Sequence, residues 1–140
     1  MTIEYVWRGP FTDDELEPIH AEAFDRPTLA DPGWRAQVEG HSLGWVTARD
    51  DATRLVGFVN VAWDGGVHAF ILDAVVAATS RRRGIATELV ALAERESRAA
   101  GCEWLHVDFE PHLTAFYLEA CGFRMTPAGV IELQVTETAW

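Results

Sequence analysis

Residues 81–86, with the sequence Arg-Arg-Arg-Gly-Ile-Ala, are the segment whose residue types and spacing best suit a chemical function. They lie between an apolar, β-rich run and an amphipathic helical pattern. The first turn of a helix leaves backbone N–H groups without intrahelical partners, and the helix dipole places partial positive charge there. Gly84 and Ala86 are small enough for a phosphate to approach the backbone, and guanidinium groups suit phosphate oxygens. The segment therefore predicts a cradle for a diphosphate.

A simpler interpretation of residues 81–86 is an ordinary turn between a strand and a helix, with its arginines in solvent. Two observations favour the anion site. Arginine at a helix N-terminus is unfavourable for the dipole. The chain as a whole is acidic, with 22 Asp and Glu against 11 basic residues, all of them Arg. The common phosphate-loop motifs GxxxxGKS/T and GxGxxG are absent.

The net charge of −11 limits the partners that this chain can have. Such a field repels phosphate backbones and anionic lipids, so we expect neither a nucleic acid nor a membrane as partner. No apolar run reaches membrane length, and the first residues lack a basic stretch that leads into an apolar core. We therefore expect a soluble, cytoplasmic protein.

The periodicity of apolar residues predicts an α/β chain in the order β-α-α-β-β-β-α-β-α-β-β. The expected strands are residues 3–7, 43–48, 54–63, 67–77, 103–109, 122–126 and 130–135. The expected helices are residues 12–24, with a capping box of Thr12 and Glu15, then 34–39, a long helix from 85 that Gly101 ends, and 113–121. No repeat or linker divides residues 1–140, so we expect one domain. Its mixed, mostly antiparallel sheet has about seven strands and four flanking helices.

A second candidate site lies in the strand expected at residues 103–109 and just beyond it. His106, Asp108, Glu110 and His112 alternate along the chain, so an extended backbone puts all four on one face. His-x-Asp is part of some iron-binding facial triads, and a metal-dependent enzyme that uses His106 and Asp108 is one alternative. The open polar face of a strand produces the same pattern without a metal, and we assign no metal ligand.

The pattern Arg81-x-x-Gly84-x-Ala86 after a β-strand resembles the coenzyme A signature of the GNAT superfamily of N-acetyltransferases. The elements before the signature, and Phe116-Tyr117 and Cys121-Gly122-Phe123 after it, extend the resemblance over nearly the whole chain. The resemblance implies transfer of the acetyl group of acetyl-CoA to an amine of a small molecule, or of a peptide N-terminus or side chain. It also implies a sheet splayed between the fourth and fifth strands. The chain could form a homodimer.

Carried over by position, the resemblance assigns a donor site to two neighbouring segments. The backbone of residues 81–86 would hold the pyrophosphate, with Thr87 just behind it, and the edge of residues 74–76 would pair with the pantetheine arm. A backbone N–H near Val76 would stabilise the oxyanion. The expected cofactor-binding residues are Ala74, Val75, Val76, Arg81, Arg82, Arg83, Gly84, Ile85, Ala86 and Thr87.

The same resemblance makes Tyr117 the candidate acid for the leaving thiolate. Family members commonly place this tyrosine four residues before the Gly of Gly-Phe, whereas Tyr117 lies five before Gly122 and Leu118 holds the usual register. A shift of one residue rotates a helical side chain by about 100°. Three carboxylates, or a chain of waters, could serve as the base. Asp73 lies within an apolar strand, where burial would raise its pKa, and Asp108 and Glu110 lie on the polar face of the next strand.

The acceptor pocket is weakly encoded, and its candidates are the residues that this family places on the first helices and the strands facing the gap. They are His20, Phe24, Trp34, His41, Trp45 and Trp63. An alternative in another functional class is a catalytically silent domain that binds coenzyme A as a sensor or partner module. The cradle suits both, and only turnover distinguishes them.

Overall fold

The computed structural model describes residues 2–134. Its strands are β1 (Glu4–Trp7), β2 (Ser42–Arg49), β3 (Leu55–Trp63), β4 (His68–Val76) and β5 (Trp104–His106). Its α-helices are α1 (Asp13–Ala23), α2 (Trp34–His41) and α3 (Ile85–Ala99). Two 3₁₀ turns, η1 (Ala78–Ser80) and η2 (Pro111–Leu113), and one π-helical turn, η3 (Phe116–Ala120), complete the elements.

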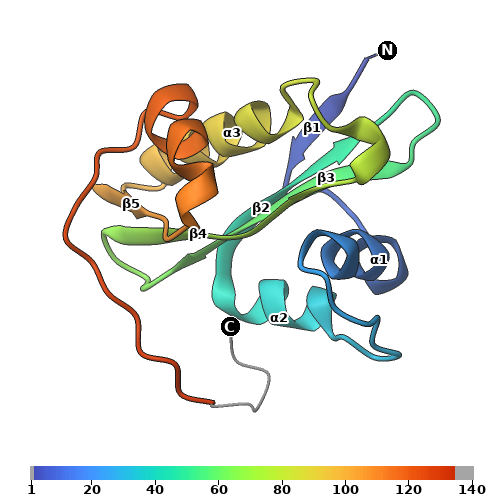
Figure 1. Cartoon of the computed structure of the whole chain (residues 1–140), viewed down its shortest axis with the longest axis horizontal. Coiled ribbons are helices and arrows are strands. Elements are labelled where there is room, and N and C mark those ends of the chain that lie inside the picture. The colour runs from blue at the N-terminus through green and yellow to red at the C-terminus, as the bar shows by residue number, and fades with distance from the viewer. Residues whose placement is uncertain (1, 135–140) are drawn as a thin grey trace.

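The five strands form one sheet in the order β1-β2-β3-β4-β5. The first four pair antiparallel, and β5 pairs parallel with β4, so the sheet is mixed. Helix α3 covers one face, and α1 and α2 cover the other (Figure 1). The expected α/β domain with a mixed sheet and four helices is confirmed, the fourth helix being the π-helical turn η3.

Both faces of the sheet are buried, because strand side chains alternate and each face has its own helical partner. On the α3 side, Val59 and Val61 pack with Leu89 in one core cluster. On the other side, Phe58 packs with Leu16 and Val38 in a second cluster. Residues 55–61 of β3 are therefore all buried, as expected for a central strand covered on both faces.

The expectation of about seven strands is wrong. Residues 122–126 and 130–134 form no strand, and Val135, the last residue of the second expected strand, lies outside the described residues. The strand expected at 103–109 is only three residues long. A β-strand forms only where a neighbouring strand pairs with it. The apolar, β-branched sequence Val130-Ile131 has high β-propensity, but no strand within residues 2–134 pairs with it.

None of the helices within residues 2–134 is both long enough and apolar enough to cross a membrane.

Candidate functional site

The sheet opens between β4 and β5, which pair at only three positions, from His68 with Trp104 to Phe70 with His106. Strand β4 continues to Val76, and no strand within residues 2–134 pairs with this second half on the β5 side. A β-bulge lies in the same half: Phe58 faces Val75 and Asn60 faces Leu72, so β4 has one additional residue there. The expected splay between the fourth and fifth strands is thus present, with a free backbone edge along β4.

The bulge sets the direction of the groups on this edge. The Ala77 N–H donates to the Val56 carbonyl at 2.8 Å, which turns the Val76 backbone groups to the opposite side, toward the gap, because strand groups alternate. In agreement, the Val76 carbonyl accepts a hydrogen bond from Arg81 Nε at 3.3 Å. The Val76 N–H therefore points to the open edge and can donate to an acyl oxygen placed there.

The turn between β4 and α3 leaves the start of the helix open. Helix α3 begins after Gly84, which has φ +75°, and no side chain caps it. A Cβ built on Gly84 would meet nothing within 4 Å, so the space beside this residue is open. Within residues 2–134, the first-turn N–H groups of Ile85, Ala86 and Thr87 therefore receive no capping side chain, and they are of the kind that a phosphate group accepts from.

The side chains around this turn divide into an anchored and an exposed set. The Ile85 side chain is buried in the core on the α3 side, so it fixes where the helix begins and offers only its backbone to a ligand. Arg81, Arg82 and Arg83 are exposed. Arg82 has φ +66°, an uncommon conformation for a residue with a side chain, and it lies two residues before the positive φ of Gly84. Guanidinium groups, which suit the oxygens of a diphosphate, thus lie next to the uncapped backbone amides at the start of α3.

Asp73 occupies the bulge with φ +55°, and a chain of side chains from α1 holds it. His20 Nε2 lies 2.9 Å from Asp73 Oδ1, and His20 Nδ1 lies 3.0 Å from a terminal nitrogen of Arg26. Arg26 also donates to both carboxylate oxygens of Glu17, at 2.7 Å each. A guanidinium can only donate, so His20 Nδ1 accepts, and the neutral imidazole donates its Nε2–H to Asp73.

Glu17 anchors this chain. Its side chain is buried and its carboxylate accepts from Arg26, from the Leu29 backbone N–H at 2.6 Å and from Trp34 Nε1 at 2.9 Å. The Arg26 hydrogen bonds, outweighing the opposing effect of burial, lower the pKa of Glu17 to about 2. The Asp73 side chain at the other end is 22% exposed, so it meets both His20 and solvent. Asp73 is thus held by the protein on one oxygen and accessible from outside.

Tyr117 lies in η3 with its ring buried among three aromatic rings, those of Phe109, Phe116 and Phe123. Burial raises the pKa of Tyr117 above its usual value of 10.0, and the charges of Cys121 and Asp108 raise it further. The phenol therefore keeps its proton at neutral pH, as a proton donor must.

The π-helical turn accounts for the unusual spacing of Tyr117. The Cys121 N–H donates to the Phe116 carbonyl, five residues back, and the Phe123 N–H donates to the Tyr117 carbonyl. A π turn holds one residue more than an α turn and often occurs at functional sites. The additional residue between Tyr117 and Gly122 is thus accommodated inside the turn, so the count of five does not imply the 100° rotation expected for an α-helix.

The other sequence candidates near β5 do not gather into a site. Asp108 and Glu110 are exposed beyond the end of the strand, and Glu110 pairs at 3.5 Å with His112. His106 instead lies 2.8 Å from His68. Among the residues that the structure describes, no three His, Cys, Asp or Glu side chains are grouped so as to hold a metal ion.

Three of the six acceptor candidates come together beside Asp73. Phe24 stacks on His20 at 4.4 Å between ring centroids, and Trp34 lies 4.5 Å from the same imidazole. The remaining three lie elsewhere: Trp45 is in the core on the α1 side, Trp63 packs against the core on the α3 side, and His41 is exposed at the end of α2. Sequence reasoning missed Arg26 and Glu17. The available signal was a charged residue beside Leu16 on the buried side of α1, three positions before His20.

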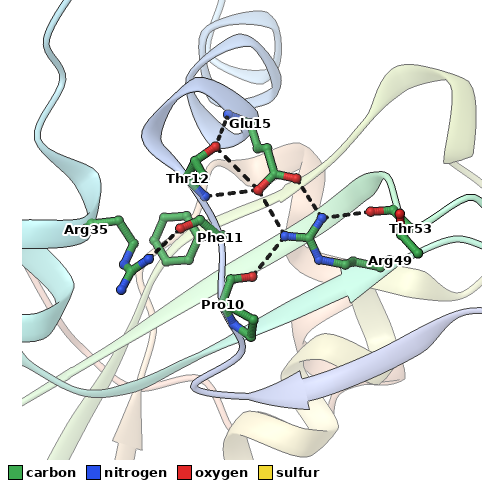
Figure 2. Close-up of a pocket in the computed structure, with 7 residues that line it drawn as sticks. All are labelled: Pro10, Phe11, Thr12, Glu15, Arg35, Arg49 and Thr53. Carbon is green, nitrogen blue, oxygen red and sulfur yellow. Dashed lines mark hydrogen bonds and ion pairs between the residues drawn. The ribbon is translucent and has the colours of Figure 1, made fainter.

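Two surface depressions lie near α1. The larger, of about 420 Å³, is lined by the start of α1 and by Arg35 and Arg49, whose guanidinium groups already bond to protein oxygens (Figure 2). The smaller, of about 150 Å³, lies between α1 and η1, where Glu22 accepts the Ala78 N–H at 3.0 Å. Neither includes the open amides of α3.

A family model described as Acetyltransferase (GNAT) family matches residues 7–123. No curated protein matches the chain in sequence. A GNAT family acetyltransferase from Streptococcus pneumoniae TIGR4 has a TM-score of 0.75 at 19% identity, over 95% of this chain and 98% of that chain. Glucosamine-6-phosphate N-acetyltransferase from Arabidopsis thaliana gives 0.74 at 13%, over 96% and 100%. The structure of AAC(6')-Iy with the bisubstrate analogue CoA-S-monomethyl-acetylneamine gives 0.72 at 18%, over 97% and 100%.

Proposed function

The chain belongs to the GNAT family of acetyltransferases, and from that membership we propose a single-domain enzyme that transfers the acetyl group of acetyl-CoA to an amine of a small molecule. The observation that carries the proposal is the uncapped start of α3 beside the free edge of β4. One feature binds phosphate and the other binds an extended, amide-bearing arm, and coenzyme A contains both.

The donor site consists mainly of backbone. The amides of Ile85, Ala86 and Thr87 hold the diphosphate, and the arginines of residues 81–83 add positive charge beside it. The edge of residues 74–76 offers alternating N–H and C=O groups to the amides of the pantetheine arm, as an added strand would. Acetyl-CoA, when bound, supplies the acetyl thioester.

Three groups serve the chemistry. The Val76 N–H donates toward the acyl oxygen at the open edge, and Tyr117 holds the proton that the departing thiol sulfur needs. Asp73 takes the proton of the attacking ammonium, since an amine must be uncharged to act as a nucleophile. His20 keeps the Asp73 carboxylate in place through Nε2, because Arg26 occupies its other nitrogen.

The acceptor side suits a cationic amine. Asp73 offers a partly exposed carboxylate, and Phe24, which is more than half exposed, lies against His20 beside it. Two structural relatives are a glucosamine-6-phosphate N-acetyltransferase and AAC(6')-Iy, the latter in complex with the bisubstrate analogue CoA-S-monomethyl-acetylneamine. A peptide N-terminus or side chain would present the same charge.

The second candidate is a silent module that binds coenzyme A without turnover. The open turn would serve that role equally well, whereas binding of coenzyme A alone does not require a carboxylate fixed at the bulge of β4. This observation favours the enzyme.

An assay of thiol release from acetyl-CoA against a broad panel of amines tests the proposal, together with calorimetric binding of acetyl-CoA to the same protein. We expect binding and amine-dependent release of coenzyme A. Binding with no release on any amine would favour the silent module. No binding at millimolar acetyl-CoA would contradict both.

A further inference from the structure

Large apolar side chains are exposed on both sides of Asp73. Apart from the segment after η3, those within residues 2–134 belong to two places, the end of α1 with the loop after it and the β4–β5 end of the sheet. They are Phe24 and Leu29 in the first place and Val67, Phe70, Leu72 and Trp104 in the second. The contact of His20 with Asp73 joins the two places. Such a concentration of exposed apolar groups marks a surface that binds another molecule.

Strand alternation shows which face of β4 carries this surface. Ala69 and Ile71 pack in the core cluster on the α3 side, so Phe70 and Leu72 point to the opposite face, where α1 lies. Helix α2 packs on β2 and β3, and Phe70 and Leu72 remain 38% and 41% exposed. The bulge puts the Asp73 side chain on this same face, directly after Leu72, because a side chain of α1 contacts it.

Three apolar side chains surround the carboxylate, and we call Phe24, Leu72 and Phe70 the apolar platform. Phe24 stacks at 4.4 Å on the imidazole next to Asp73 and is 54% exposed. Leu72 lies beside Asp73 in the strand, and Phe70 lies about 7 Å farther along β4. The Phe70 ring is itself fixed by stacking on His106, at 4.7 Å between centroids and 17° between planes. Two members of the platform are phenyl rings, which favour an aromatic partner.

The polar side chains behind Asp73 already have partners within the protein. Both ring nitrogens of His20 are bonded, one to Asp73 and the other to Arg26. Arg26 also donates to Glu17 and to the Pro27 carbonyl. A sugar carries several hydroxyl groups, and each needs a hydrogen-bond partner when it leaves water. One accessible carboxylate among apolar groups instead suits a single ammonium group attached to an apolar body.

We propose that the acceptor is an arylalkylamine, in which a short carbon chain joins the amine to an aromatic ring; this substrate class rests on the acetyl transfer proposed above. The ammonium group meets Asp73, and the ring contacts the apolar platform. The amine nitrogen bonds to the acetyl carbon as the carbon–sulfur bond breaks. Of the two protons that the ammonium loses, one passes through Asp73 to solvent, and the other replaces the proton that Tyr117 gives to sulfur. The products are an N-acetyl amide, coenzyme A and one proton.

Rates of thiol release from acetyl-CoA by the full chain test the substrate class. The acceptors are 2-phenylethylamine, ethylamine, which lacks the ring, and glucosamine, which replaces the apolar body by hydroxyl groups. We expect kcat/KM for 2-phenylethylamine to exceed the values for the other two acceptors at least about tenfold, because it alone places an aromatic ring on the platform.

Leu72→Gln and its matched control Leu133→Gln test the platform itself. Both leucines are exposed, and both variants replace an apolar side chain by an amide. Leu72→Gln should lower the ratio of kcat/KM for 2-phenylethylamine to that for ethylamine about tenfold, mainly through KM, and Leu133→Gln should leave it unchanged. Calorimetric binding of acetyl-CoA shows that each variant is folded. Should Leu72→Gln fail to bind it, Phe70→Gln is judged by the same ratio.

Failure of the substrate class can be distinguished from failure of the proposed function. Turnover of glucosamine or ethylamine as fast as 2-phenylethylamine, or an unchanged ratio in Leu72→Gln, would reject the arylalkylamine and leave acetyl transfer in place. A dimer that Leu72→Gln dissociates in light scattering, with the ratio unchanged, would assign the platform to a second copy of the chain. No turnover on any amine would reject the proposed function, and the arylalkylamine with it.

Discussion

Two turns of this protein lead into helices with arginines close by, and they use their donors in opposite ways. At the start of α1, Thr12 Oγ1 accepts the Glu15 N–H at 3.2 Å, and the Glu15 carboxylate accepts the Thr12 N–H at 3.0 Å. Arg49 then donates to Glu15 at 2.6 Å and to the Thr53 carbonyl at 2.8 Å (Figure 2). Thr12, Arg35 and Arg49 thus each donate to a protein oxygen at this turn.

The turn into α3 has no comparable side-chain hydrogen bonds to its first amides. No side chain caps the helix, and the position above Gly84 is open. Arginines beside a helix N-terminus therefore do not by themselves make an anion site. What matters is whether the chain has already used the amides, and of these two turns the one into α3 is the one without a side-chain cap.

The strongest test of this contrast is Gly84→Val, compared with Gly101→Val at the other end of α3. Both glycines have positive φ, and a Cβ at either meets nothing within 4 Å, so both variants should lose a similar 1–2 kcal/mol or so of stability. Only Gly84→Val places a branched side chain where phosphate meets backbone. We expect about a 100-fold loss of acetyl-CoA affinity by calorimetry for Gly84→Val and little change for Gly101→Val. An equal loss of acetyl-CoA affinity in both variants would contradict a diphosphate site at the α3 turn.

Tyr117→Phe separates the chemistry proposed for Tyr117 from the binding proposed for the α3 turn. The variant keeps the ring packing against Phe109 and Phe123 but lacks the proton, so turnover should fall by about 100-fold while acetyl-CoA affinity stays the same. Rates and affinity are measured on the same preparation. Unchanged turnover would assign the proton to another donor.

Arg49→Ala and Arg81→Ala should have opposite effects: the first should lower stability without changing acetyl-CoA affinity, and the second should lower affinity with little change in stability. Arg49→Ala leaves Glu15 and two carbonyls without their donor, so unfolding should become easier by about 2 kcal/mol in urea, with acetyl-CoA affinity unchanged. Arg81→Ala should change stability by less than about 0.5 kcal/mol and weaken acetyl-CoA binding about tenfold. If Arg81→Ala costs as much stability as Arg49→Ala, the contrast between the turns fails.

The α1 side should also govern the stability of the protein in acid. The pKa of Glu17 is lowered from 4.5 to about 2 in the folded protein, so ionised Glu17 stabilises the fold above about pH 4.5, and this contribution is lost as the pH falls toward 2. Glu17→Gln should make the unfolding free energy depend less steeply on pH in this window. Glu39→Gln, which alters an exposed pair with Arg35, is the control and should keep the steep dependence.

The smallest expected effect concerns the α1 cap itself. Thr12→Ala removes the side chain that accepts the Glu15 N–H, and the loss should be about 1 kcal/mol in the free energy of unfolding. Thr12→Ser keeps the hydroxyl and should restore most of it. Acetyl-CoA affinity should not move in either variant.

Elements with local signals were predictable from the sequence. The capping box of Thr12 and Glu15 is present, and Gly101, with φ +92°, follows the end of α3 as expected. The order of strands and helices up to α3 follows the apolar periodicity. Residues 122–126 and 130–134 form no strand although strands were expected there. Strand formation depends on a pairing partner, and β-propensity alone does not identify one.

The candidate site divides in the same way. The cradle proposed at residues 81–86 depends on a local motif, so the sequence alone was enough to propose it. The contact of His20 with Asp73 joins residues 53 positions apart, and Arg26 enters it from a loop whose path the sequence does not specify. The bulge that turns the Val76 backbone groups toward the gap is a single additional residue in an otherwise regular strand. The apolar, β-rich sequence of residues 68–76 predicts a strand whether or not it contains a bulge.

The π-helical turn of η3 also affects how this chain should be aligned with related sequences. The resemblance to this family implies one additional residue between Tyr117 and Gly122, and the wider turn accommodates that residue before Phe123. An additional residue confined in this way leaves Phe123 in contact with the Tyr117 ring and bonded to the Tyr117 carbonyl. Alignments of related chains should therefore open a gap between Tyr117 and Gly122 instead of shifting the tyrosine onto Leu118.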